Sequence, residues 1–201
     1  PCLLFAFAAC VACWRESSAK PQRKVLDLSK YAAFDGVRVN LVQGPGGVTA
    51  DETGSSRGIS NSDARNLLLH LRTLADVVLT DGETARLERY RIPKKSDLAV
   101  FTRKGYVPEP GTSEHRLIEI ADESLVHAVE VLMTLGYRRI LIEAGPSLLR
   151  DSWHAFDELC LSNTGGSEAD LAKLGIAQAE QVATQSVDDA TFSVWREIQG
   201  F

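Results

Sequence analysis

The chain has 201 residues, and 44% of them are apolar, which is enough to bury one substantial core and makes a single domain the default. The formal net charge is −5 and the charges are not gathered in blocks, so the sequence lacks the electrostatic signature of a nucleic-acid-binding protein. Small soluble ligands are the expected partners, and neither nucleic acid nor a membrane is expected.

The first 35 residues are predicted to be an N-terminal extension. Residues 3–14 are strongly apolar, but they lack a basic leader and are too few to span a bilayer. We expect a buried or partner-facing segment in a cytoplasmic protein, with a processed export signal as the alternative. Cys10 and Cys13 have the spacing of redox and metal sites, yet no second CxxC pair or nearby histidine completes a zinc site. Chance or helix packing is the favoured interpretation, and no metal is expected.

Segments of strand character alternate with segments of helical periodicity along the rest of the chain. In chain order we expect a short helix at residues 30–36, a strand at 37–42, an amphipathic helix at 62–74, strands at 76–80, 98–102 and 116–120, a helix at 124–135, a strand that turns into a helix within 140–149, and strands at 156–161 and 192–198. Residues 167–181 are rich in alanine and are predicted to be helical or partly loose. Asn61 or Ser62 can cap the second helix, and Gly136 can close the third.

This alternation predicts an α/β domain whose mainly parallel central sheet is covered by helices on both faces. Ligands of such sheets bind at the carboxyl ends of the strands. The turns after Val42, Leu79, Phe101 and Ile142 are therefore expected to build the site.

Residues 140–149, ILIEAGPSLL, are typical of a buried strand that runs through a Gly-Pro turn into a helix. Free N–H groups and the helix dipole at such a junction favour a phosphate group, so a nucleotide cofactor is one interpretation. A tight turn without a ligand is the other, since glycine serves both purposes. The four histidines have no plausible catalytic partner beside them and are expected to be structural or exposed: His70, His115, His127 and His154.

Seven segments carry a resemblance to a known family. They are residues 39–42 (VNLV), 56–60 (SRGIS), 71–79 (LRTLADVVL), 84–88 (TARLE), 101–103 (FTR), 143–149 (EAGPSLL) and 157–161 (DELCL). Together they resemble the reductase domain of the bifunctional riboflavin-biosynthesis deaminase/reductase, over roughly residues 37–166. The resemblance implies a single dihydrofolate-reductase-like domain, which we assign to residues 36–201.

The resemblance also implies an activity. In that family NADPH delivers a hydride to the sugar carbon of a ribosylamino-pyrimidine 5′-phosphate, as in 5-amino-6-(5-phosphoribosylamino)uracil reductase. We therefore expect an NADPH-dependent oxidoreductase with a small pyrimidine nucleotide as substrate. The family commonly forms dimers, so a homodimer is expected, with residues 3–14 as one possible contact.

Site residues are carried over by position. The cofactor-binding positions implied are Thr84, Glu88, Thr102, Arg103, Gly145, Pro146, Ser147, Leu148 and Leu149, where Arg103 suits the 2′-phosphate of NADP. The substrate-binding positions implied are Ser56, Arg72 and Glu143. Glu143 is also the proposed catalytic acid, with solvent as the alternative proton donor.

Two positions depart from the family pattern. Gly46 replaces an aspartate near the site, and Gly58 replaces a bulky residue, which is expected to leave a looser pocket. These departures support a second hypothesis, a non-catalytic nucleotide-binding or dimerisation protein of the same fold. A folate reductase is a minor alternative within the first hypothesis.

Overall fold

The computed structural model describes residues 24–121, 124–166 and 168–201, so the predictions for residues 3–14 and for Cys10 and Cys13 lie outside the described residues. The strands are β1 (Gly36–Gln43), β2 (Val77–Asp81), β3 (Asp97–Phe101), β4 (Leu117–Ile120), β5 (Arg139–Ile142), β6 (Glu158–Asn163), β7 (Ile176–Val187) and β8 (Ala190–Gly200). The α-helices are α1 (Ser62–Leu74), α2 (Gly82–Leu87), α3 (Leu125–Thr134) and α4 (Pro146–Leu149). Short 3-10 turns are η2 (Leu28–Lys30), η3 (Pro45–Gly47), η4 (Trp153–Ala155) and η5 (Ala172–Leu174).

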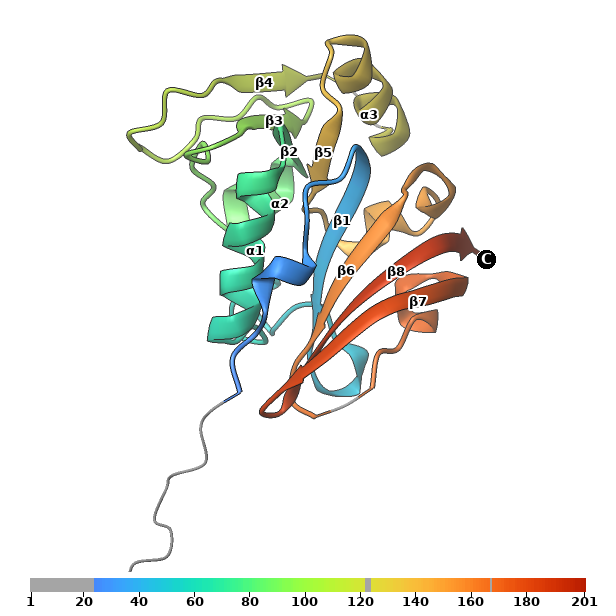
Figure 1. Ribbon diagram of the computed structural model, residues 1–201. Helices are drawn as coiled ribbons and strands as arrows, with labels where there is room; N and C mark the ends of the chain where they lie inside the picture. The colour runs from blue at the N-terminus through green and yellow to red at the C-terminus, as the bar shows by residue number, and fades with distance from the viewer. Residues whose placement is uncertain (1–23, 122–123, 167) are drawn as a thin grey trace, which may run out of the picture.

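The strands form one sheet in the order β4-β3-β2-β5-β1-β6-β8-β7 (Figure 1). The six strands from β4 to β6 are parallel, and β8 and β7 complete the sheet in antiparallel pairs. The prediction of a mainly parallel sheet is confirmed.

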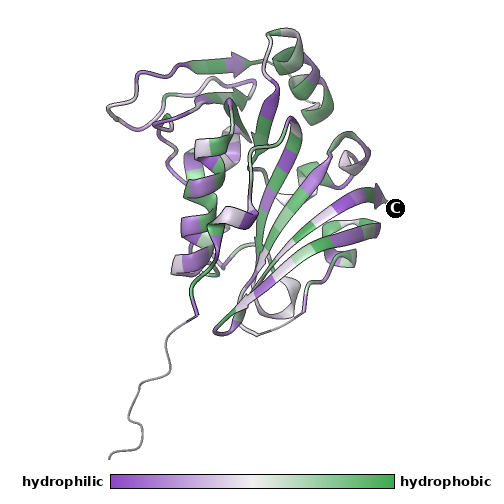
Figure 2. Cartoon of the chain, viewed as in Figure 1, coloured by the Kyte–Doolittle hydropathy of each residue, from purple (hydrophilic) through white to green (hydrophobic). Residues whose placement is uncertain are grey.

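Helices cover both faces, as predicted. On one face, α3 and the buried Leu149 and Trp153 pack against strand residues such as Val39 and Ile142. On the other face, α1 and α2 pack against residues such as Val78 and Leu141. Figure 2 shows apolar segments concentrated in the central strands and polar segments on the outer side of α1. The sheet is therefore buried on both sides, as a parallel sheet requires.

The cap signals in the sequence set the ends of two helices correctly. The Asn61 side chain accepts a hydrogen bond from the N–H of Ala64, and α1 spans the predicted residues 62–74. Ser124 caps α3 in the same way, through the N–H of His127. Gly136 adopts a positive φ of 93°, the left-handed conformation that ends a helix.

The predicted helix at residues 30–36 is wrong. A 3-10 turn begins earlier, because the Asp27 carboxylate accepts the N–H of Ser29, and the chain is not helical from Tyr31 onward. Gly36 opens β1, where a Cβ would lie 2.6 Å from Asp157 Oδ2. Glycine is required at position 36 because the Asp157 carboxylate approaches it closely, and not because it ends a helix. Leu26 and Tyr31, from the predicted extension, are buried beside α1.

Of the segment predicted to be helical or partly loose at residues 167–181, residues 168–175 contain only the short turn η5 and irregular chain, as the looser alternative expected. The prediction is wrong for residues 176–181, which begin β7, a twelve-residue strand at the edge of the sheet. Most of its side chains are exposed or half-buried, so the strand lacks the alternating apolar pattern that identifies a strand in a sequence. Hydrogen bonding to β8 holds this segment in the strand conformation, which its own side-chain pattern does not indicate. Strand β8 itself was predicted, at residues 192–198.

The connections of β1 and β5 diverge at the centre of the sheet. The chain leaves β1 through α1 toward β2, whereas it leaves β5 through α4 toward β6, and β1 and β5 are neighbours. A crevice at the carboxyl ends of two such strands is where ligands of open α/β sheets bind.

Candidate active site

A pocket with a volume of about 170 Å³ occupies this crevice. Three segments from the sheet contribute to its wall, namely residues 40–42 of β1, residues 143–146 after β5, and Ser162 of β6. The loop after β1 and helices α1 and α2 complete it with Thr49, Ala50, Gly54, Ser56, Ser60, Ala64, Leu68, Thr84, Leu87, Glu88 and Tyr90. The predicted turns after Val42 and Ile142 thus meet at one site, whereas the turn after Phe101 is not among the described pocket-lining residues.

Arg72 and Glu143, both predicted to bind substrate, bind each other. Arg72 Nε donates to Glu143 Oε1 at 2.9 Å and its terminal nitrogen donates to Oε2 at 2.6 Å. The Tyr90 hydroxyl also donates to Oε2, and the guanidinium lies 4.8 Å from the Tyr90 ring centroid. Only 5% of the Glu143 side chain and 19% of the Arg72 side chain are exposed. The cluster therefore fixes the Glu143 carboxylate as an acceptor at the pocket wall.

The charges in this cluster reinforce one another. Burial disfavours a charged guanidinium, but the adjacent Glu143 carboxylate outweighs burial and raises the pKa of Arg72. Burial, together with the same carboxylate, raises the pKa of Tyr90 well above its ordinary value. Arg72 stays protonated and Tyr90 stays neutral at physiological pH, so Tyr90 remains a hydrogen-bond donor.

Glu88 holds the loop that covers the pocket. Its Oε1 accepts from the hydroxyls of Ser55 and Ser56 and from the Ser56 N–H, at 2.8 to 3.1 Å. Its Oε2 accepts from Arg57 Nε at 2.9 Å. Burial favours the protonated acid, but these hydrogen bonds outweigh it and lower the pKa of Glu88. Glu88 was predicted to contact a cofactor, and the structure places it at the pocket wall as the anchor of residues 55–57.

The two glycines that depart from the family pattern lie in different surroundings. A Cβ on Gly58 would lie 2.8 Å from the Asp51 Cβ, and the Gly58 N–H donates to the Asp51 carboxylate at 3.1 Å. The space that the glycine was expected to leave is therefore filled by Asp51. Gly46 has φ +70°, no atom lies within 4 Å of its Cβ position, and it is not among the described pocket-lining residues.

Four of the predicted cofactor positions line the pocket, whereas the other five are not among its described lining residues: Thr102, Arg103, Ser147, Leu148 and Leu149. Gly145 and Pro146 line it, and a Cβ on Gly145 would meet nothing closer than Ser147 Oγ at 3.9 Å. Helix α4 has only four residues and no side-chain cap at Gly145, while Leu149 is buried in the core and Leu148 packs against it. Thr84 lines the pocket, and its hydroxyl donates to Asp81 at 2.6 Å.

Thr102 and Arg103 follow β3 directly. A Cβ on Gly82 would lie 2.7 Å from the Thr102 Cβ, so the ends of β2 and β3 approach closely. Arg103 is exposed. The open space at Gly145 and the basic side chain near Thr102 fit a dinucleotide, whose phosphates need backbone donors and cations. Gly145, Ser147, Thr102 and Arg103 would hold it.

Sequence reasoning missed Asn40 and Tyr90. Asn40 lines the pocket, and its Oδ1 is buried without a hydrogen-bond partner among the described residues. An amide near the carboxyl end of a mostly apolar strand was the available signal. Tyr90 carried no signal, because its role depends on Glu143, which lies 53 positions away.

A second cavity, of about 270 Å³, lies at the other end of β1 and β6. Arg38 and Arg196 line it, and both donate to the buried carboxylate of Glu158. Phe34 packs against both guanidiniums, with distances of 5.5 and 5.6 Å to its ring centroid. This network is typical of a structural ion cluster. The pocket that lies where the sheet connections diverge is the candidate functional site.

Among the described residues, no cluster of three or more His, Cys, Asp or Glu side chains is arranged to hold a metal ion. No helix in the described part of the chain is long and apolar enough to cross a bilayer.

No protein-family model and no curated protein matches the chain in sequence. Solved structures do match in fold. A pyrimidine reductase-like protein from Corynebacterium diphtheriae has 16% identity and a TM-score of 0.64, over 88% of this chain and 96% of that one. A dihydrofolate reductase from Enterococcus faecalis, complexed with NADP(H), has 14% identity and a TM-score of 0.52, over 80% of this chain and 95% of that one.

The third match is a bifunctional diaminohydroxyphosphoribosylaminopyrimidine deaminase/5-amino-6-(5-phosphoribosylamino)uracil reductase from Thermotoga maritima. It has 14% identity and a TM-score of 0.62, over 84% of this chain and 57% of that one. The chain thus spans a little more than half of the bifunctional protein. These matches confirm the predicted dihydrofolate-reductase-like fold.

Proposed function

We propose that this protein is an NADPH-dependent reductase of a ribosylamino-pyrimidine phosphate, the class of reaction catalysed by 5-amino-6-(5-phosphoribosylamino)uracil reductase. One observation carries the proposal. The pocket lies at the carboxyl ends of β1 and β5, and it combines hydrogen-bonding side chains with the open, glycine-bordered turn after β5. The fold shared with solved reductases supports it.

NADPH, when bound, would supply the hydride for the sugar carbon attached to the exocyclic nitrogen. The protein then contributes position and orientation, and no covalent nucleophile is needed. Asn40 and Glu143 present acceptors to the amino groups of the heterocycle, while Ser56 and Ser60 offer hydroxyls.

A proton must reach the sugar ring oxygen or the imine nitrogen as the hydride arrives. Both oxygens of Glu143 already accept hydrogen bonds, from Arg72 and Tyr90. That arrangement favours an acceptor over a proton donor, so we assign the proton to solvent and a positioning role to Glu143.

NADPH is the proposed cofactor in preference to NADH. Arg103, on the exposed segment after β3, is the proposed partner of the 2′-phosphate. The proposed enzyme is homodimeric and cytoplasmic. Sedimentation of the full chain tests whether it forms a dimer.

A second candidate is a nucleotide-binding protein without catalysis. The observation that favours it is the closed cluster of Arg72, Glu143 and Tyr90, which fills hydrogen-bonding capacity that a substrate could use.

The deciding experiment titrates NADPH and NADH while thermal stability and nicotinamide fluorescence are monitored, and then adds the ribosylamino-pyrimidine while nicotinamide absorbance is followed. The proposal expects tighter binding of NADPH and oxidation of it upon substrate addition. Binding without oxidation would favour the second candidate, and no binding of either nucleotide would refute both.

A further inference from the structure

The second cavity, at the other end of β1 and β6, has no role in the proposed reaction. Residues 30–34, Arg38 of β1, Glu158 of β6 and the hairpin of β7 and β8 enclose its volume of about 270 Å³. By liquid volume this is room for about nine water molecules. A small organic ligand therefore fits.

The wall of this cavity carries more positive than negative charge. Lys30, Arg38 and Arg196 line it, whereas Glu158 is the one acidic residue of the described wall. Arg38 Nε donates to Glu158 Oε1 at 2.6 Å, and Arg196 donates to Oε2 at 2.8 and 3.0 Å. Only 10% of the Arg38 side chain and 3% of the Glu158 side chain are exposed. Because one carboxylate cannot neutralise two guanidiniums, positive charge remains in a poorly solvated place, where an anion would be stabilised.

Other acidic residues near this end of the sheet do not supply the missing charge. The Asp157 carboxylate accepts a backbone N–H of β1 and is not among the described lining residues. Glu180 lies opposite Arg196 in the β7–β8 register, but it is exposed and no ion pair joins the two. Asp27 and Asp35 are exposed and bind a neighbouring serine and an arginine before β5.

Donors and an apolar surface remain available to a ligand. Neither Arg196 Nη1 nor Lys30 Nζ makes any of the described hydrogen bonds. About half of the Arg196 side chain, 49%, is exposed, so its free nitrogen can reach a ligand. Phe34 and the exposed Val182 form an apolar part of the wall. Guanidinium and ammonium groups are the side chains that bind phosphate oxygens in proteins.

The second cavity is distinct from the candidate active site, although both lie on one face of the sheet. Side chains alternate along a strand, so Arg38 and Asn40 project to the same face of β1. Arg38 lines the second cavity, whereas Asn40 lines the candidate active site. On β6, the fully buried Cys160 lies between Glu158 of one wall and Ser162 of the other. A ligand of the second cavity therefore would not occupy the substrate pocket.

We infer that the second cavity is a ligand site of its own, which takes a small phosphate monoester. The phosphate would bind Lys30 and Arg196 and compensate the positive charge beside Arg38. The organic part would pack against Phe34 and Val182. A phosphate monoester carries a charge of about −1.5 to −2 at neutral pH, which matches the surplus in the wall better than a monocarboxylate does.

Calorimetry of the full chain tests the site, with phenyl phosphate as the probe and phenol as its uncharged counterpart. We expect phenyl phosphate to bind at least about tenfold more tightly than phenol, with an affinity that falls as salt is added. Equal affinities, or no binding of phenyl phosphate, would overturn the inference.

A pair of arginine variants locates the bound phosphate. Arg196→Gln should weaken the binding of phenyl phosphate by about tenfold or more, whereas Arg103→Gln, in the segment proposed for the cofactor, should leave it unchanged. The reverse pattern would place the phosphate at the candidate active site and contradict the inference. The proposed reductase function does not depend on either result.

A pair of lysine variants covers the case in which the loss of a Glu158 partner destabilises Arg196→Gln. Lys30→Gln removes an exposed cation of the wall and leaves the ion cluster intact, while Lys24→Gln removes an exposed cation outside the described wall. We expect about threefold weaker binding of phenyl phosphate in Lys30→Gln, no change in Lys24→Gln, and the same midpoint of urea unfolding in both. Equal affinities in the two variants would show that the second cavity does not hold the phosphate.

Discussion

Arg72 of α1 and Glu143 after β5 form a bidentate ion pair, with N···O distances of 2.9 and 2.6 Å, at the wall of the candidate active site. The pair joins a helix on one face of the sheet to the carboxyl end of a central strand. Planar guanidinium and carboxylate groups match in this geometry, so the contact fixes both side chains in orientation as well as in distance.

Removing the arginine alone should therefore destabilise the fold. Arg72→Met leaves a buried carboxylate without its cation, and we expect a loss of about 3–5 kcal/mol in the free energy of unfolding, measured in urea. The double variant with Glu143→Gln should recover part of this loss, because no uncompensated charge remains. Arg65→Met, at an exposed position of the same helix, is the control and should change stability by less than about 0.5 kcal/mol.

Glu88→Gln should loosen the loop over the pocket. The amide keeps the size of the side chain but loses the charge in the bonds to Ser56 and Arg57, so residues 51–58 should exchange amide hydrogens faster. For an active enzyme we expect KM to rise several-fold with a smaller change in kcat. Glu83→Gln, exposed on the same helix, is the matched control, and equal effects from both variants would contradict the anchoring role.

The same residue gives a pH dependence with a definite sign. The pKa of Glu88 in the folded protein lies below the ordinary value of 4.5, because hydrogen bonds to the carboxylate outweigh burial. Ionised Glu88 therefore contributes its full stability above about pH 4.5, and the contribution is lost as the pH falls through the lower folded value. The difference in unfolding free energy between wild type and Glu88→Gln should shrink from about pH 7 to about pH 3. A constant difference would exclude this linkage.

The loss of stability caused by Gly58→Ala should depend on the side chain at position 51, whereas the loss caused by Gly46→Ala should not. A methyl group on Gly58 meets Asp51, so we expect a loss of about 1–3 kcal/mol, which Asp51→Gly should partly relieve in the double variant. Gly46→Ala should cost about 1–2 kcal/mol from its positive φ alone, and it should be additive with Asp51→Gly. Additive behaviour in both pairs would disprove the contact.

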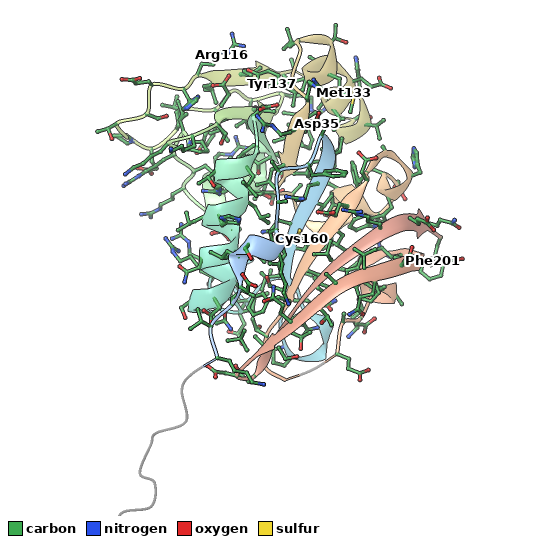
Figure 3. The ribbon with its side chains drawn as sticks, in the orientation of Figure 1. Asp35, Arg116, Met133, Tyr137, Cys160 and Phe201 are labelled. Atoms are coloured by element: carbon green, nitrogen blue, oxygen red, sulfur yellow. The ribbon has the colours of Figure 1, made fainter. Side chains whose placement is uncertain are left out.

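Cys160 should resist alkylation in the folded protein. Its side chain lies in the middle of the sheet (Figure 3), it is fully buried, and burial raises the pKa of the thiol to about 12. The thiolate is the reactive form, so the native protein at neutral pH should show no modification of this residue. Peptide mapping by mass spectrometry, with and without urea, measures this position separately from the other cysteines. Rapid labelling without urea would contradict the burial.

Much of the fold could be predicted because its signals are local. Helix α1 was bounded correctly from Asn61 and its apolar spacing, and α3 was predicted to within one residue at each end, with Gly136 as the stop signal. Strand β7 was missed because its side chains are mostly polar or small and exposed, so that only its pairing with β8 makes it a strand. Pairing with a distant partner leaves no trace in the local pattern.

The site could be predicted in position but not in detail. The turns after Val42 and Ile142 were expected to form it, and residues at both turns line the candidate pocket. The partners of Arg72 and Glu88 could not be foreseen, because they lie 71 and about 32 residues away along the chain. Sequence reasoning assigned both residues to ligand binding. In the structure, Arg72 binds Glu143, and Glu88 binds Ser56 and Arg57. Asn40 was missed for the opposite reason, since its importance lies in a hydrogen-bond partner that none of the described residues supplies.

The ion pair between α1 and β5 also constrains how this protein can diverge. A mutation at position 72, 90 or 143 leaves two partners with unmatched charge or hydrogen bonds, so a single change is selected against unless a second follows. These three positions are therefore expected to covary among homologues, with descendants keeping either the whole trio or none of it.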